Sequence, residues 1–129
     1  MRLLVTGGSG FIGSHVVDAL IAANHEVVVY DQSKSTYFNE RATFIEGDIN
    51  DEEALLSTSK GCDVIYHFAA IADIGEAISK PAKTFQVNVM GTLNVLEAAR
   101  QNDIKRVIFA SSIYVFSNKG AFYRTSKRT

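Results

Sequence analysis

A glycine-rich stretch near the amino terminus has the residue types and spacing of a phosphate-binding loop. It reads VTGGSGFIGSH, follows a short apolar run and precedes an apolar pattern of helical period. The first amides of a helix have no acceptor within it and lie at the positive end of the helix dipole. The amides of Phe11 and Ile12 are therefore the expected donors to a phosphate.

The three glycines of this stretch have different expected tasks. Gly7 would permit the tight turn, Gly10 the close approach of a diphosphate, and Gly13 the packing of helix on strand. The lysine of an ATP-hydrolysing phosphate loop does not follow, which disfavours ATP hydrolysis. A tight turn that binds no ligand is the simpler alternative, and the glycines alone leave it open.

Asp31 is the acidic residue expected to hold a ribose. It ends an apolar run, HEVVVYD, 18 residues after Gly13, where a carboxylate can accept both hydroxyls of an adenosine ribose. A carboxylate there repels a 2′-phosphate, and no arginine follows in DQSKS, so NAD is favoured over NADP. Lys34 weakens this preference slightly, and a solvated aspartate at a strand end is the alternative.

The elements that must position these residues alternate between strand and helix. Continuous apolar runs predict strands at 2–6, 27–30, 43–46, 63–68 and 106–111. Helical periodicity predicts a first helix at 11–23, a short one that Asn50 can cap with Glu53 three residues on, and a long one from about Pro81 to Asn102. The first helix carries an apolar stripe of Ile12, Val16, Ala19, Leu20 and Ala23, and the long helix one of Phe85, Val89, Leu93, Leu96 and Ala99. This order predicts an α/β domain with a doubly wound, Rossmann-type parallel sheet.

Composition places the chain among ordinary soluble domains. Its 129 residues fit one domain, and the net charge of −1 gives no reason to expect nucleic acid as a partner. No apolar run is long enough for a membrane span, and the start lacks a signal-peptide core. Cys62 is the single cysteine, so no intrachain disulfide can form, and we expect a cytoplasmic protein.

Five motifs in this order resemble the extended short-chain dehydrogenase/reductases. They read TGGSGFIGSH, GDI, HFAA, NVMGTLNVLEAAR and YRTSK, and together they span nearly the whole chain. More narrowly, the chain is similar to the NAD-dependent epimerase/dehydratase family, whose members mostly act on nucleotide sugars. The resemblance implies NAD as cofactor and a nucleotide sugar as substrate of a full-length form.

The resemblance also implies further contacts with the cofactor. Asp48 would bind the adenine amino group, Ile49 would pack on the ring, and Asn88 would hold a strand or the cofactor in place. The HFAA turn would pass along the cofactor through Phe68, Ala69 and Ala70. Two simpler roles stay open, because Asp48 can initiate a turn and Asn88 can be a polar residue on a helix face.

The catalytic set that the resemblance implies is Ser112, Tyr123 and Lys127. Tyr123 and Lys127 stand four residues apart, on one face of a helix. A free tyrosine has a pKa of about 10, and a nearby cation lowers it towards neutrality. Tyr123 would take a proton from a sugar hydroxyl, Lys127 would also bind the nicotinamide ribose, and Ser112 would hydrogen-bond the reacting oxygen. The segment at 115–117 reads VFS, where the family has V-Y-G, and a Y-x-x-x-K spacing also occurs by chance.

The remaining expectations concern histidines, chain length and assembly. His15, His25 and His67 form no metal-ligand pattern, and His67 is expected to pack or hydrogen-bond locally. Only two residues follow Lys127, so we expect a Rossmann sheet truncated after its fifth strand, with a cofactor-binding core, no substrate pocket and little or no turnover. The resemblance also implies a homo-oligomer formed through the helix at about 82–101. A non-catalytic module that binds or senses a dinucleotide is the alternative function.

Overall fold

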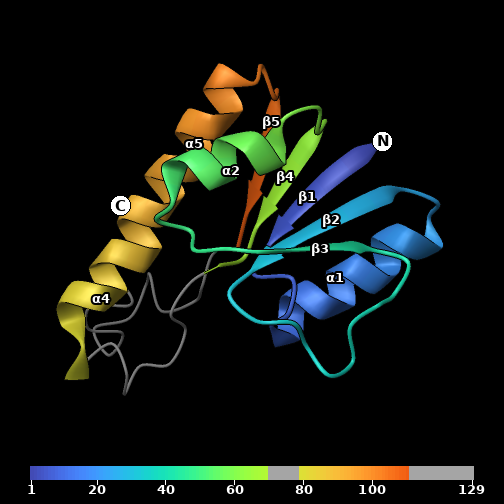
Figure 1. The fold of residues 1–129 in the computed structure, drawn as a ribbon, viewed down its shortest axis with the longest axis horizontal. Coiled ribbons are helices and arrows are strands. Elements are labelled where there is room, and N and C mark those ends of the chain that lie inside the picture. Colours follow the sequence, from blue (N-terminus) through green and yellow to red (C-terminus); the bar gives the residue numbers. More distant parts are fainter. Residues whose placement is uncertain (70–78, 111–129) are drawn as a thin grey trace.

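The described part of the chain folds around one parallel sheet of five strands. The computed structural model describes residues 1–69 and 79–110. The strands are β1 (Arg2–Thr6), β2 (Glu26–Asp31), β3 (Thr43–Glu46), β4 (Val64–His67) and β5 (Arg106–Phe109), and their order across the sheet is β3-β2-β1-β4-β5 (Figure 1). This is the order of a doubly wound nucleotide-binding sheet, so the predicted fold class is confirmed.

The described helices connect the strands as crossovers. They are α1 (Phe11–Ala22), α2 (Glu52–Ser59), α4 (Pro81–Phe85) and α5 (Gly91–Gln101), with a π-helical turn at Gln86–Met90 between the last two. Among the helices of residues 1–69 and 79–110, none combines the length and the apolar character needed to cross a membrane.

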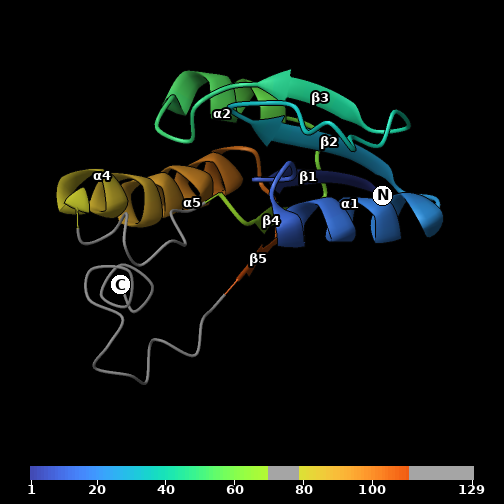
Figure 2. The ribbon, with the colours of Figure 1, turned by 90° about the horizontal axis from the view of Figure 1, so that it is seen from below.

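Helices cover both faces of the sheet (Figure 2). Successive strand residues point to opposite faces, so Val5 and Val29 pack with α1, whereas Leu4 and Val28 belong to the cluster that includes residues of α2 and α5. All four of these side chains are buried. Burying one such side chain contributes about 1.5–3 kcal/mol, and the two apolar layers hold the central strands rigid.

The buried stripe of α1 differs from the predicted one. Gly13, Val17 and Ile21 face the sheet, whereas Ile12 of the predicted stripe is 59% exposed. The physical reason is the close approach at Gly13, where an added Cβ would collide with the carbonyl oxygen of Gly7. The helix packs against the loop through Gly13. Because glycine has no apolar side chain, a stripe chosen by hydrophobicity did not include it.

The short helix α2 is capped by a different residue from the one predicted. Asp51, not Asn50, is its N-cap, and its Oδ1 accepts a hydrogen bond of 3.1 Å from the amide of Ala54. The amide of Asn50 instead donates to Oδ1 of Asp48 at 2.9 Å. This turn at Asp48 moves the start of the helix one residue along the chain.

The predicted long helix is interrupted by the π-helical turn. A π turn closes its hydrogen bonds over one more residue than an α turn, so it rotates the face that follows. Val89 and Ala99 of the predicted stripe are buried, but Leu93 and Leu96 are 52% and 48% exposed. Val95 and Ala98 face the sheet in their place.

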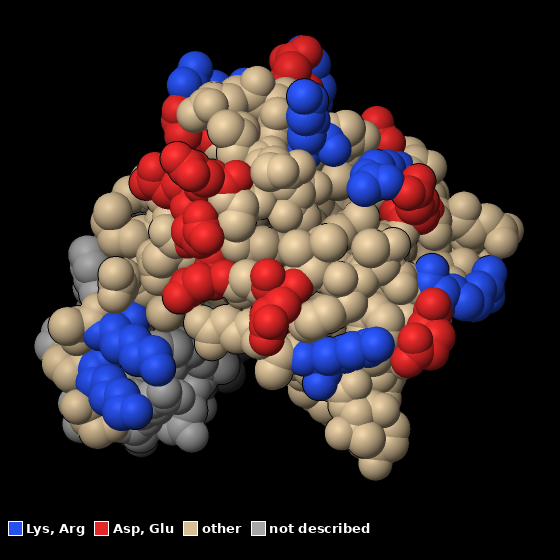
Figure 3. All heavy atoms as spheres, in the orientation of Figure 1, with Lys and Arg blue, Asp and Glu red and all other residues tan. Residues whose placement is uncertain are grey.

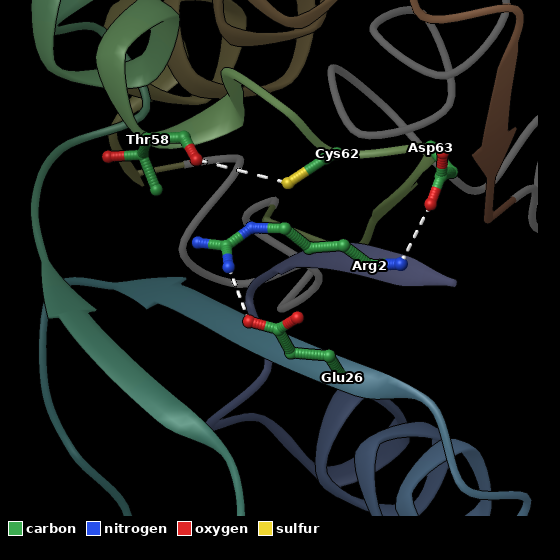
Figure 4. A network of polar contacts seen from close by, with 5 residues as sticks. All are labelled: Arg2, Glu26, Thr58, Cys62 and Asp63. Atoms are coloured by element: carbon green, nitrogen blue, oxygen red, sulfur yellow. Dashed lines mark hydrogen bonds and ion pairs between the residues drawn. The ribbon is translucent and has the colours of Figure 1, made fainter.

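The amino-terminal ends of β1 and β2 carry a polar network (Figure 4). The Arg2 guanidinium pairs with Glu26, and the Arg2 amide donates to Oδ2 of Asp63 at 2.8 Å. Cys62 lies beside them, and burial raises the pKa of its thiol. These contacts hold together the edge of the sheet opposite to the one at which the strands end.

Candidate functional site

A cleft of about 400 Å³ opens at the carboxyl ends of the strands. In a doubly wound sheet this edge, where the strand order reverses beside β1, is the position at which nucleotides bind. The residues lining it are Gly7, Ser9, Gly10, Tyr30, Asp31, Gln32, Ser33, Gly47, Ile49, Phe68, Ala69, Lys83 and Val87. They come from the glycine loop, the ends of β2 and β3, the turn after β4, and the α4 segment.

The glycine loop is shaped by two positions that admit no side chain. Gly7 has a φ of +70°, and a Cβ there would lie 2.6 Å from the amide nitrogen of Ala69. Gly13 packs against the backbone of Gly7 and Gly8. Gly10 is different, because the nearest atom to an added Cβ would be 3.4 Å away, and Gly10 lines the cleft. The tight turn at Gly7 and the close packing at Gly13 therefore have a geometric basis, and the diphosphate contact at Gly10 stays a prediction.

The amino terminus of α1 presents free amides at this loop. Gly10 is the N-cap and carries no capping side chain, and the first turn contains no acidic residue. The first intrahelical bond is from Ser14 to Gly10, at 2.8 Å, so the amides of Phe11 and Ile12 precede the hydrogen-bonded ladder. The side chains of both residues point to solvent. The arrangement favours an anion by unpaired donors and by the helix dipole.

Asp31 lies at the end of β2 and already supports the loop. Its Oδ2 accepts from the amide of Ser9 at 3.0 Å, and its Oδ1 accepts from the amide of Gln32 at 2.7 Å. Each carboxylate oxygen has a second acceptor site, so both can still receive a hydroxyl. Asp31 thus both braces the glycine loop and remains able to hold a ribose, and the first of these tasks was not predicted.

Ser9 carries a polar atom that is matched to a ligand. Its hydroxyl oxygen is buried, has no hydrogen-bond partner among the described residues, and belongs to a side chain that lines the cleft. An orphaned buried hydroxyl is costly unless something satisfies it. The residues present therefore fit a polar, anionic group seated against the loop.

The GDI segment forms the wall at the ends of β2 and β3. Tyr30 donates its hydroxyl to the Asp48 carbonyl at 2.7 Å, and Ile49 is buried yet lines the cleft. The Asp48 side chain initiates the turn to Asn50, which is the structural role left open above, and its Oδ2 remains available. Burial, and then the charges of Asp51 and Asp48, raise the pKa of Tyr30 to about 12.

The turn after β4 and the π-helical turn form the opposite wall. Phe68 and Ala69 line the cleft, and their amides lie 3.2 and 3.3 Å from the hydroxyl of Thr6. Asn88 is buried, and its neighbour Val87 reaches the cleft. The other predicted site residues, Ala70, Ser112, Tyr123 and Lys127, lie outside the described residues.

Several lining residues were missed from the sequence. Tyr30 and Ser9 are adjacent to predicted positions, so proximity to the motifs was a usable signal. Lys83 and Val87 stand on the segment before Asn88, and the π turn that presents Val87 has no sequence signal that we recognise. Lys83 is the one cationic lining residue of the part that is described, and Asp31 is its acidic counterpart.

The site has the donors and acceptors for a dinucleotide and no metal centre in its described part. In residues 1–69 and 79–110, no three His, Cys, Asp or Glu side chains are grouped to hold a metal ion. His67 packs and hydrogen-bonds, as predicted, through contacts with Thr6, Thr92 and Phe109. The described part of the cleft thus combines the glycine loop at the start of α1 with a carboxylate at the end of β2.

Three known proteins similar to this chain are described as UDP-glucose 4-epimerases. A putative UDP-glucose 4-epimerase from Methanocaldococcus jannaschii is 39% identical over 114 residues, which cover 85% of this chain and 37% of the relative. The structure of UDP-glucose 4-epimerase from Brucella ovis in complex with NAD superposes with a TM-score of 0.89 at 33% identity, over 98% of this chain and 44% of that one. The structure of UDP-glucose 4-epimerase from Thermotoga maritima with UDP-glucose superposes with a TM-score of 0.82 at 38% identity. The match covers 87% of this chain and 38% of that one.

This chain therefore spans less than half the length of each of these three proteins. A family model nevertheless matches almost all of it, from residue 3 to residue 128. The motifs, the strand order and this match agree: the chain belongs to the NAD-dependent epimerase/dehydratase family.

Proposed function

We propose that this chain is the NAD-binding portion of a nucleotide-sugar epimerase that acts on a UDP-hexose. The observation that carries the proposal is the combination, in one cleft, of a glycine loop with free helix amides and the Asp31 carboxylate. The UDP-glucose 4-epimerases of B. ovis and T. maritima, crystallised with NAD and with UDP-glucose, support the choice of cofactor and substrate class.

In and beside the cleft, the described residues offer groups for the diphosphate and the adenosine part of NAD. The amides of Phe11 and Ile12 and the orphaned Ser9 hydroxyl would bind the diphosphate. Asp31 would accept the adenosine ribose hydroxyls, and its charge would exclude a 2′-phosphate. Asp48 and Ile49 would hold the adenine, the first by a hydrogen bond and the second by packing.

The reaction itself would depend on Ser112, Tyr123 and Lys127. NAD, when bound, supplies a reversible hydride acceptor. Tyr123 would remove the proton from a sugar hydroxyl while Ser112 hydrogen-bonds the same oxygen, and Lys127 would stabilise the tyrosinate. The support for this set is the family match through residue 128 and the four-residue spacing of Tyr123 and Lys127.

Parallel titration with NAD and NADP tests the proposed cofactor. The unsubstituted protein should bind NAD more tightly, and Asp31→Ala should weaken NAD binding by about tenfold or more, because hydrogen bonds to a charged group are lost. Asp63→Ala is the matched control: it removes a carboxylate that also accepts a backbone amide, but at the opposite edge of the sheet. Equal affinity for the two cofactors in the unsubstituted protein would contradict the proposal.

A dinucleotide-binding or sensing module without catalysis is the competing function. Tyr123→Phe in the full-length protein separates the two, because it removes only one hydroxyl. The proposal expects loss of epimerase turnover with NAD affinity retained. Absence of turnover in the unsubstituted full-length protein, with NAD bound, would favour the sensing module.

A further inference from the structure

His67 is a buried polar residue to which the proposed function gives no task. It ends β4 and is 2% exposed. Its Nδ1 lies 2.6 Å from the Thr6 hydroxyl, and its Nε2 lies 3.0 Å from the Thr92 hydroxyl. The ring also stacks on Phe109, at 5.9 Å between centroids. The imidazole therefore connects β1 to α5 on one face of the sheet.

The backbone explains why these groups meet. Thr6 and His67 are partners in the register of β1 and β4, and His67 and Phe109 are partners in that of β4 and β5. Register partners of neighbouring strands point to the same face, so the threonine and the ring lie side by side. The cluster on this face includes Val95 and Ala98 of α5, and Thr92 stands one turn before Val95.

The hydrogen-bond partners fix the direction of each proton. The Thr92 hydroxyl donates to the Asn88 carbonyl at 2.7 Å, so its single proton is used and it must accept from Nε2–H. Nδ1 is then an acceptor, and the Thr6 hydroxyl donates to it. That hydroxyl accepts from the amide of Ala69 at 3.3 Å, and it shares the amide of Phe68, which lies 3.2 Å from it and 2.9 Å from the Thr6 carbonyl oxygen. We call this chain of hydrogen bonds, from Asn88 through Thr92 and His67 to Thr6, the relay. Every described donor in the relay meets an acceptor.

The two ends of the relay contact the two turns that together form one wall of the cleft, the turn after β4 and the π-helical turn. At one end, Thr6 holds the amides of Phe68 and Ala69, which line the cleft. At the other end, Thr92 holds the carbonyl of Asn88, within the π-helical turn whose Val87 also lines the cleft. A π turn is rare and is usually retained where it serves a site. The relay connects it to the central strand.

We propose that His67 is a positioning residue for the cofactor. Through Thr92 it fixes the π-helical turn, and through Thr6 it fixes the turn after β4, so that both stand at the spacing the dinucleotide requires. The inference rests on the proposed function for the identity of the ligand, although the relay itself is a property of the protein alone.

Substitutions at Thr92 test the relay with little risk to folding. Thr92→Val keeps the shape and removes the hydroxyl, and it should weaken NAD binding about fivefold, the size expected for one lost hydrogen bond. Thr92→Ser retains the hydroxyl and should restore the affinity. Thr84→Val is the matched control, because the Thr84 hydroxyl makes the same bond to the carbonyl four residues earlier, at 3.0 Å to Lys80, without a histidine. It should leave NAD affinity unchanged.

The tautomer of His67 gives a second measurement that needs no ligand. Nitrogen-15 NMR of the imidazole should show a neutral ring with the proton on Nε2, and Thr92→Val should perturb that resonance whereas Thr84→Val should not. A proton on Nδ1, or equal loss of NAD affinity in Thr92→Val and Thr84→Val, would overturn the relay. If the unsubstituted protein does not bind NAD, the proposed function fails, and the tautomer still decides whether the relay exists.

Discussion

At the scale of single residues, the groups that would bind NAD also maintain the cleft. Asp31 braces the glycine loop through Ser9, and Tyr30 supports the Asp48 carbonyl. Gly7, Gly10 and Gly13 share one loop but differ in what an added methyl group would touch. At the glycines, effects on stability and on binding can therefore be separated.

Alanine at two of these glycines should affect different properties, the free energy of unfolding at Gly13 and the NAD affinity at Gly10. Gly13→Ala forces a Cβ into the backbone of Gly7 and should lower the free energy of unfolding by about 1–3 kcal/mol. Gly10→Ala meets no such obstacle and should change stability by less than about 0.5 kcal/mol, while its methyl group weakens NAD binding by about tenfold. Chemical denaturation and NAD titration of both variants check this pair. Equal stability of the two variants would contradict the close approach at Gly13.

Tyr30 should ionise at a higher pH than a tyrosine of an unfolded chain. Its pKa is raised to about 12, compared with about 10 in an unfolded chain. The stabilisation that the neutral phenol provides is complete below pH 10 and is lost between pH 10 and 12. Absorbance titration of the phenolates should show a late step that Tyr30→Phe removes. Persistence of that step in the variant would assign it to another tyrosine.

At the scale of elements, the sequence predicted the strands better than the helix faces. Continuous apolar runs, such as the one around Val28, locate buried parallel strands within one or two residues. The stripe on α1 was wrong at Ile12, whereas Leu20 packs against the core as predicted. The closest contact is made by Gly13, which hydrophobicity ignores. The stripe on α5 was wrong at Leu93 because a π turn precedes it. Where backbone contacts decide which face of a helix packs on the sheet, the pattern of apolar residues does not predict that face.

The candidate site was predictable to the same extent. The glycine loop and Asp31 follow from known motif chemistry, and the structure places them in one cleft. The brace between Asp31 and Ser9, and the reach of Val87, depend on how separate elements meet. Such contacts cannot be inferred from spacing along the chain.

The cap of α2 provides a test of element boundaries. Asp51→Ala removes the side chain that accepts from the Ala54 amide and should cost about 1 kcal/mol of unfolding free energy. Asn50→Ala is the control, since Asn50 contributes its backbone amide, which alanine retains. Thermal denaturation of both variants measures the difference. A larger loss for Asn50→Ala would restore the cap predicted from the sequence.

At the scale of the whole molecule, Asp and Glu side chains gather in a band on the face seen in Figure 3, whereas Lys and Arg side chains are scattered over it. Three exposed apolar side chains of the described residues, Met90, Leu93 and Leu96, recur at three-residue spacing on α5 and its preceding turn. Residues at this spacing share a helix face. The predicted homo-oligomer would cover it.

Charged substitutions on this face should dissociate that oligomer. The double variant Leu93→Glu, Leu96→Glu should be monomeric, because an interface cannot bury two unpaired carboxylates. Tyr37→Glu is the control, at an exposed aromatic residue outside α5. Light scattering over a range of concentrations gives the masses. A monomeric unsubstituted protein would contradict the prediction.

A crystal structure with NAD would show most directly whether the junction of β1 and α1 binds the cofactor. The diphosphate should lie against the amides of Phe11 and Ile12, with the adenosine ribose on the Asp31 carboxylate. NAD bound elsewhere, with this junction empty or filled by a side chain, would contradict this prediction.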